Sequence, residues 1–172
     1  MNITSKTQAK PGYWLAIILG IFAFWMGGSL VLDMVVMPSM YMTGMMEQPD
    51  FVLAGSFMFS VFNHVEILCA ATGLTGILIL GATLPEGFSN RIRTMMILSL
   101  FLVGVSLVYT YGLTPEMSSL GISLDLFNET AVFPKEMIQL QLEYWGLEVL
   151  KLATAGLVAG WCLRNFRLAE EY

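Results

Sequence analysis

Charged residues are scarce in this chain. Asp, Glu, Lys and Arg make up 12% of its 172 residues, whereas a soluble domain carries about a quarter. Hydrophobic residues make up 56% of the chain, and the mean hydropathy is +0.72. Too little charge is present to cover an ordinary globule with solvated side chains. The composition therefore indicates an integral membrane protein, whose first partner is the lipid bilayer.

Other absences exclude further classes of protein. The net charge is -5 and no basic stripe occurs, which excludes a nucleic-acid partner. The two cysteines, Cys69 and Cys162, both lie in apolar segments, so we expect no disulfide framework. We find no nucleophile motif, phosphate loop or multi-ligand metal pattern, so the sequence gives no positive support to an enzyme.

Four long apolar runs are present instead. A membrane helix needs about 20 residues to cross roughly 30 Å of hydrocarbon, and helices satisfy their own backbone groups in lipid. We therefore predict an all-α fold, an integral membrane four-helix bundle in a single transmembrane domain. Pro38 is expected to end the first span, Thr114 and Pro115 the third, and residues 113–137 to form an outer loop. The predicted spans are approximately 14–37, 57–82, 92–112 and 138–163.

The basic residues predict the orientation of these spans. Cytoplasmic loops carry an excess of Lys and Arg. Here the basic residues group before the first span, between the second and third, and after the fourth: Lys6 and Lys10, Arg91 and Arg93, Arg164 and Arg167. We therefore expect both termini to be cytoplasmic. A plasma membrane and an internal bacterial membrane such as a thylakoid both remain open.

Ionisable residues interrupt the apolar runs, at a cost of at least about 2.5–3.5 kcal/mol each in a bilayer. With a rise of about 1.5 Å per residue, they fall at similar depths in the outer part of the bundle, as do Tyr109 and Tyr111. Such residues usually face the protein interior and often serve a function. We therefore predict a ligand-binding site from Asp33, His64, Glu66, Tyr111, Tyr144, Glu148 and Lys151.

Alternative readings of these residues remain open. Tyr144, Glu148 and Lys151 share one helix stripe, and the last two can simply neutralise each other as a local ion pair. His64 points about 200° away from Glu66 on a helix, so the two need not share a neighbour. His64 is either a neutral histidine bonded to a carbonyl or hydroxyl group, or a metal ligand, haem ligand or proton carrier.

Methionine is abundant, with 13 in the chain. Four of them, Met40, Met42, Met45 and Met46, lie close together after the first span. Thioethers select Cu(I) over hard ions, so these four are candidate copper ligands. The alternative is that methionine fills space at the rim of the bundle as a flexible apolar residue.

Small residues form a further pattern in the last span. Gly156 and Gly160 make a GxxxG motif, which lets helices approach closely. It serves packing within the bundle or, alternatively, homodimerisation.

Several short motifs occur along the spans, namely Trp25-Met-Gly27-Gly28, Pro38, Ala54-Gly55-x-Phe57 and Tyr111-Gly-Leu-Thr114-Pro115-Glu116. They resemble those of a family of small four-helix membrane proteins of unassigned function, which is similar to the membrane domain of copper-resistance D proteins. Members of that family often carry a Leu-His pair early in the last span, where this chain has Leu142-Glu143-Tyr144. The resemblance implies a four-helix bundle and a link to copper.

Three functions compete at this point. The first is binding or transport of a small ligand or a copper ion at an outer-side intramembrane polar site. The second is a non-catalytic structural or assembly subunit of a larger membrane complex. The third is a proton- or electron-transfer enzyme that uses His64 with Glu66 or Glu148. The sequence leaves the ligand, the partner and the oligomeric state open.

Overall fold

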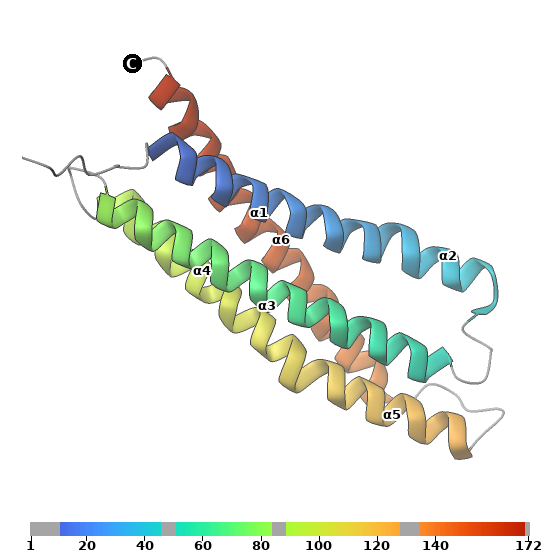
Figure 1. The fold of residues 1–172 in the computed structure, drawn as a ribbon. Helices are drawn as coiled ribbons and strands as arrows, with labels where there is room; N and C mark the ends of the chain where they lie inside the picture. Colours follow the sequence, from blue (N-terminus) through green and yellow to red (C-terminus); the bar gives the residue numbers. More distant parts are fainter. Residues whose placement is uncertain (1–10, 46–50, 84–88, 128–134, 171–172) are drawn as a thin grey trace, which may run out of the picture.

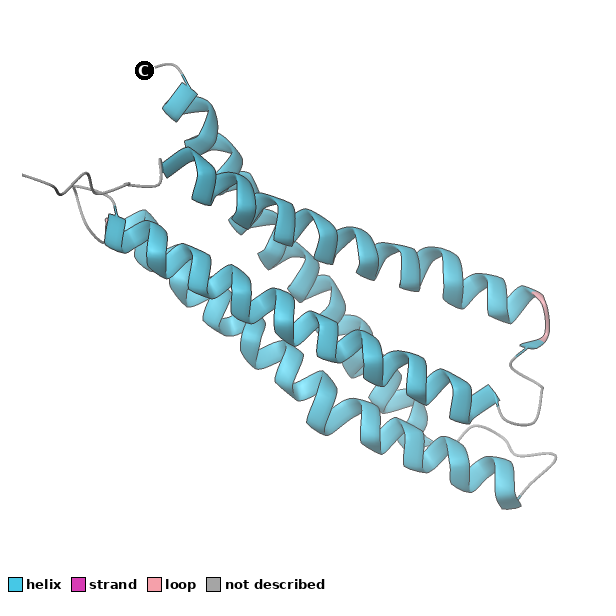
Figure 2. Cartoon of the chain, viewed as in Figure 1, coloured by secondary structure: helices cyan, strands magenta, loops and turns pink. Residues whose placement is uncertain are grey.

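The structure is a computed structural model that describes residues 11–45, 51–83, 89–127 and 135–170. Its described parts are helical except for short turns (Figure 2). Four helices are long and apolar enough to cross a membrane, which confirms the expected helical bundle and indicates a multi-pass membrane protein. These spans are Gly12–Met42, Leu53–Thr83, Asn90–Leu120 and Ile138–Arg164.

Two of the spans are composite rods and two are single helices. The first rod joins three consecutive segments, α1 (Pro11–Val31), the π-helical η1 (Leu32–Val36) and α2 (Met37–Met42). The two single helices are α3 (Phe51–Thr83) and α6 (Lys135–Glu170). The other rod joins α4 (Asn90–Val108), the π-helical η3 (Tyr109–Leu113) and α5 (Thr114–Phe127).

The four rods run in alternating directions (Figure 1). α1 packs against α3 and α6, and α4 packs against the same two helices. The start of α1 and the end of α6 lie at one end of the bundle, while α2 and α5 lie at the other. Helices α3 and α6 therefore each contact both α1 and α4.

The two prolines do not end their helices, contrary to the sequence prediction. The chain stays helical past Pro38 to Met42 and past Pro115 to Phe127. The predicted loop 113–137 is therefore wrong at Leu113, which ends η3, and over residues 114–127, which form α5. It is also wrong from Lys135 on, where α6 begins, and residues 128–134 lie outside the described part.

A π-helical turn before each proline explains why the helix continues. Proline lacks an N–H group and its ring clashes with the carbonyl four residues earlier. Here the N–H of Met37 bonds to the carbonyl of Leu32, and the N–H of Thr114 to that of Tyr109, one residue further back than in an α-helix. The wider turn lets the backbone pass the proline without breaking.

The bundle core is apolar and the outer surface is apolar as well. Ile18, Phe22 and Leu102 are fully buried at 0% exposure. Phe24 and Val149 are 67% and 65% exposed, as befits side chains that face lipid chains. Polar side chains that are buried in this molecule therefore contact other protein groups.

Helices α1 and α3 approach closely at two glycines of α3. A Cβ atom on Gly76 would lie 2.7 Å from Ile18 Cγ1, and one on Gly73 would lie 3.1 Å from the ring of Phe22. By contrast, a Cβ atom on Gly160 would meet nothing within 4 Å, and one on Gly156 only Met26 Cε at 3.6 Å. Close packing within the bundle thus uses α3 rather than the GxxxG motif of α6.

Candidate intramembrane polar site

Lys151 lies at the centre of a buried polar cluster. Its ammonium group forms an ion pair with Glu66 Oε1 of α3 and a second one with Glu148 Oε2, at 2.7 Å, on α6 itself. The three residues are only 1–2% exposed. The predicted local pair of Glu148 and Lys151 is therefore present, but the lysine is shared with a second carboxylate.

Two side chains of α1 complete the environment of Glu66. Trp25 donates its indole N–H and Ser29 its hydroxyl to Glu66 Oε1, both at 3.1 Å. Trp25 and Ser29 lie on one face of α1 because they are four residues apart. Oε1 thus accepts three hydrogen bonds, from Trp25, Ser29 and Lys151.

Tyr109, in the π turn η3, contacts Glu148 as well. Its hydroxyl lies 3.1 Å from Glu148 Oε2 and 3.1 Å from the backbone carbonyl of Tyr144. The ring of Tyr109 also lies beneath the ammonium of Lys151, with Nζ 5.1 Å from the ring centroid, within cation–π range. Tyr109 is 1% exposed, so these contacts are shielded.

Asp33, in the π turn η1, is the last member of the cluster. The hydroxyl of Tyr144 donates to Asp33 Oδ1 at 3.5 Å, a long contact. Asp33 itself is buried, with 6% of its surface exposed. We call Asp33, Glu66, Tyr109, Tyr144, Glu148 and Lys151, with Trp25 and Ser29, the polar cluster.

Both π turns supply a residue to this cluster. Asp33 is the second residue of η1 and Tyr109 is the first residue of η3. Each turn is five residues long, and in each case one residue separates it from a proline. Single π-helical turns inside α-helices are frequent at functional sites. The irregular backbone and the polar side chains thus coincide at one level of the bundle.

The cluster contains more acidic than basic groups. It holds three carboxyl groups, those of Asp33, Glu66 and Glu148, and one ammonium, that of Lys151, which pairs with the two glutamates. Among the described residues, Glu66 Oε2 and Glu148 Oε1 have no hydrogen-bond donor, although both are buried. Buried negative charge without a partner is costly. The arrangement is suited to hold a proton or another small positive charge.

Comparisons with protein-family models, with curated proteins and with solved structures find no match for the chain. The resemblance to the family similar to copper-resistance D proteins therefore stays a prediction.

Two predicted site residues lie outside the polar cluster. Tyr111 is 71% exposed. His64 is exposed on α3, and its Nδ1 lies 2.6 Å from the carbonyl oxygen of Ser60, so it bonds to its own helix. Their faces explain this, because each sits two residues from a cluster member, Glu66 or Tyr109, and so points to another side of its helix.

The methionines occupy the end of the bundle that carries α2. Met42 and Met45 are 85% and 48% exposed, Met40 is half-buried, and Met46 lies outside the described residues. In the described part of the chain, no group of three or more His, Cys, Asp and Glu side chains could hold a metal ion. Cu(I) binding by Met40, Met42, Met45 and Met46 stays a prediction.

The sequence analysis missed three members of the polar cluster as site residues, namely Trp25, Ser29 and Tyr109. A signal for the first two exists, since Trp25, Ser29 and Asp33 recur every fourth residue along one face of the first span. The sequence places Tyr109 at the depth of the site. Its contacts, however, depend on the packing of η3 against α6, which the sequence does not give.

A second polar contact lies one helix turn from Glu66. Asn63, 2% exposed, donates its amide to Thr114 Oγ1 at 2.6 Å and so connects α3 to the start of α5. Beside it, a groove of about 840 Å³ runs between α3 and α5 and is lined by several hydroxyl groups. Its polar lining comprises Ser56, Ser60, Thr110, Thr114 and Ser118.

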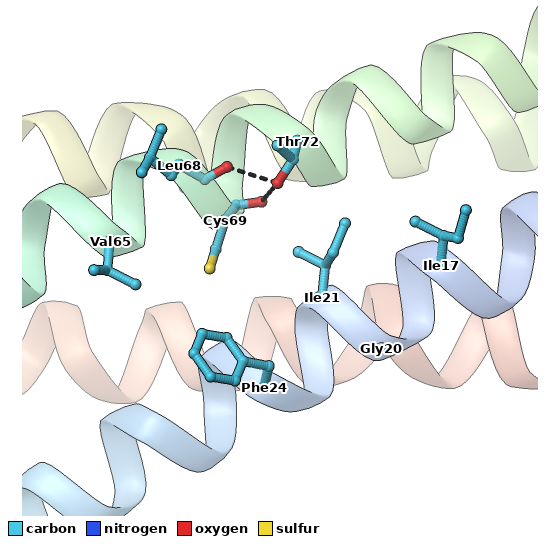
Figure 3. Close-up of a pocket in the computed structure, with 8 residues that line it drawn as sticks. All are labelled: Ile17, Gly20, Ile21, Phe24, Val65, Leu68, Cys69 and Thr72. Atoms are coloured by element: carbon cyan, nitrogen blue, oxygen red, sulfur yellow. Dashed lines mark hydrogen bonds between the residues drawn. The ribbon is translucent and has the colours of Figure 1, made fainter.

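The groove between α1 and α3 is of another kind (Figure 3). Ile21, Phe24 and Val65 border it, and its one hydroxyl, on Thr72, is satisfied by the carbonyl groups of Leu68 at 2.6 Å and Cys69 at 3.1 Å. With its polar group satisfied, this groove suits a hydrocarbon chain. None of the charged members of the polar cluster lines either groove.

Proposed function

We propose that this chain is a multi-pass membrane protein that binds a small cation at the polar cluster and transports it. The observation that carries the proposal is the excess of buried carboxyl groups over the single ammonium of Lys151. A structural ion pair would need one partner for Lys151, and here two carboxylates share it while Asp33 adds a third acidic group. The two carboxylate oxygens without donors mark where positive charge would be stabilised.

The depth of the cluster supports a role in passage across the membrane. Glu66 lies about 20 Å along α3 from Leu53 and about 26 Å from Thr83, at about 1.5 Å per residue. Solute sites of many transporters lie near the bilayer midplane, at helices whose regular backbone is interrupted. The π turns η1 and η3 are interruptions of this kind, although milder ones.

The basic residues support an orientation. Arg91 and Arg93 lie at the start of α4 and Arg164 near the end of α6, at the same end of the bundle as the start of α1. By the positive-inside rule this end is cytoplasmic. The polar cluster then lies slightly to the outer side of the middle, and Met40, Met42 and Met45 lie further out, at the end of the bundle that carries α2.

A thermal-unfolding panel tests the proposal. Purified protein is unfolded with Na⁺, K⁺, methylammonium, guanidinium or Cu(I), because a ligand that binds only the folded state raises the unfolding temperature. At least one cation should stabilise the native chain and fail to stabilise Glu66→Gln. Glu143→Gln is the matched control, since Glu143 is exposed on α6 and bonded to Gln139. No stabilisation by any of the five overturns the proposal.

Copper is one member of this panel. If Cu(I) is the stabilising cation, a further variant distinguishes delivery of the ion from its binding. In this variant Met40, Met42, Met45 and Met46 are changed to Leu. Slower loading with an unchanged stabilisation at saturation would assign the methionines to delivery. Loss of the stabilisation would make them ligands.

A further inference from the structure

We propose that the groove between α3 and the rod of η3 and α5 is a water-filled vestibule through which small cations reach the polar cluster. This inference rests on the proposed function for the role of the cluster, and it names the route to that site. The groove has a volume of about 840 Å³. Its lining includes Thr114, the hydrogen-bond partner of Asn63, which lies one helix turn before Glu66.

Hydroxyl groups on both walls of the groove are the first argument. α3 contributes Ser56 and Ser60, which are four residues apart and so share one helix face. The opposite wall contributes Thr110, Thr114 and Ser118, at the same spacing. Polar groups at membrane depth are costly to leave against hydrocarbon. Water fits here, because one molecule needs only about 10–15 Å³ of such space and a few polar partners.

The hydrogen bonds of these hydroxyl groups are the second argument, and they favour cations. Ser56 donates to the carbonyl of Leu53 at 2.9 Å, and Thr110 to that of Ser106 at 2.8 Å. A hydroxyl that gives its one proton to the backbone keeps its lone pairs as acceptors. The groove therefore offers acceptor oxygens, which suit water and cations better than anions. None of its described lining residues is charged, so a cation would pass without being held.

The depth of the groove is the third argument. On α3 its lining begins at Leu53, where the candidate membrane span starts. Asn63 lies about 15 Å further along, about half of a hydrocarbon layer of roughly 30 Å. There the Asn63 amide donates to Thr114 Oγ1 at 2.6 Å, so the two walls meet. Along the helix, Glu66 is only about 4.5 Å beyond Asn63. One helix turn therefore separates the groove from the cluster.

Cysteine modification of the full chain in lipid nanodiscs tests the vestibule. A methanethiosulfonate reagent with a quaternary ammonium group reacts with thiolates, which form in water and not among lipid chains. Ser60→Cys should therefore react at least about ten times faster than Val61→Cys. Val61 is the matched control, because it is the next residue, is 49% exposed and lines neither groove. The native chain gives the background, since Cys69 borders the apolar groove and Cys162 is buried.

A second pair of variants tests the opposite wall. Thr110→Cys, in the groove, is compared with Val108→Cys, which is 49% exposed and outside both grooves. The variant in the groove should again react faster. If a variant of one pair fails to fold, the other pair decides the test alone. Equal rates within the folded pairs overturn the inference, because lipid chains or a second copy of the chain would then fill the groove.

The charge of the reagent tests the preference for cations. The rate of the cationic reagent is divided by that of an anionic sulfonate reagent of the same reactivity. This ratio should be higher at Ser60→Cys than at Tyr41→Cys, which is 74% exposed near the end of α2. An equal ratio overturns the cation route.

The labelling result is separate from the thermal-unfolding panel, because it needs no cation to bind at the polar cluster. Fast labelling of the groove without stabilisation by any cation would overturn the proposed function alone. Stabilisation by a cation without fast labelling would overturn the vestibule alone.

Discussion

Lys151 forms a buried ion pair with Glu66, although the two residues are 85 positions apart in the sequence. The pair joins α6 to α3, helices that lie between the two rods that carry π turns. Lys151 also pairs with Glu148, so one ammonium compensates two buried carboxylates. The stability of this part of the bundle therefore depends on one side chain.

Replacing that side chain should destabilise the protein strongly. In Lys151→Met, Glu66 and Glu148 are left buried without their counter-ion, and breaking a buried pair in this way costs about 3–5 kcal/mol. The free energy of unfolding in detergent micelles measures the loss. Lys135→Met is the matched control, because Lys135 is exposed at the start of α6, and its change should stay within about 0.5 kcal/mol.

A partial rescue distinguishes charge from packing in this experiment. Adding Glu66→Gln and Glu148→Gln to Lys151→Met removes two buried negative charges and should recover part of the lost stability. A triple variant as unstable as the single one would mean that Lys151 acts through its packing and not through its charge.

The two tyrosines of η3 offer a second comparison. Tyr109→Phe removes a hydroxyl that contacts Glu148 Oε2 and the carbonyl of Tyr144, and leaves these buried acceptors with fewer partners. We expect a loss of about 1–3 kcal/mol in unfolding free energy. Tyr111→Phe, two residues further on and 71% exposed, should change it by no more than about 0.5 kcal/mol. Equal effects would contradict the assigned contacts.

The depth of the site residues along their spans could be predicted from the sequence. A constant rise per residue placed Asp33, Glu66, Glu148 and Lys151 at one level, and helix periodicity predicted the pair of Glu148 and Lys151. The partnership of Lys151 with Glu66 could not be predicted this way. It depends on which helices are neighbours in the bundle and on how each helix is rotated about its axis. The periodicity of one span gives no information on either.

The prolines show a second limit of the sequence. Proline usually marks the end of a helix, because it removes a donor and clashes with the preceding turn. At Pro38 and Pro115 a π turn avoids that clash. At Pro115, η3 and α5 also pack against α3 and α6. Single-sequence propensity has no term for such tertiary support, so α5 was predicted as a loop. The same turns carry Asp33 and Tyr109 into the polar cluster.

Close packing of α1 against α3 leads to a third prediction. In Gly76→Ala the new methyl group would lie 2.7 Å from Ile18 Cγ1, so the helices must shift, and such overpacking costs about 1–3 kcal/mol. Gly104→Ala on α4 is the control, since a Cβ atom there meets nothing within 4 Å. That variant should gain up to about 1 kcal/mol from helix propensity. Thermal unfolding of both variants checks the difference in sign.

The orientation of the bundle gives the fourth prediction, tested with a membrane-impermeant maleimide. Tyr41 is 74% exposed near the end of α2, and Asn90 is exposed at the start of α4, at the opposite end. Tyr41→Cys should be labelled in right-side-out vesicles, and Asn90→Cys only in inverted ones, because the positive-inside rule predicts that the end with Arg91 and Arg93 is cytoplasmic.

The native cysteines allow this comparison without further changes. Cys69 and Cys162 are 8% and 0% exposed, so they should remain unlabelled in both preparations. The reverse labelling pattern would place the arginine-bearing end outside. Met40, Met42 and Met45 would then face the cytoplasm, and the polar cluster would lie on the inner side of the bilayer midplane. A cation delivered by those methionines would then have to come from inside the cell.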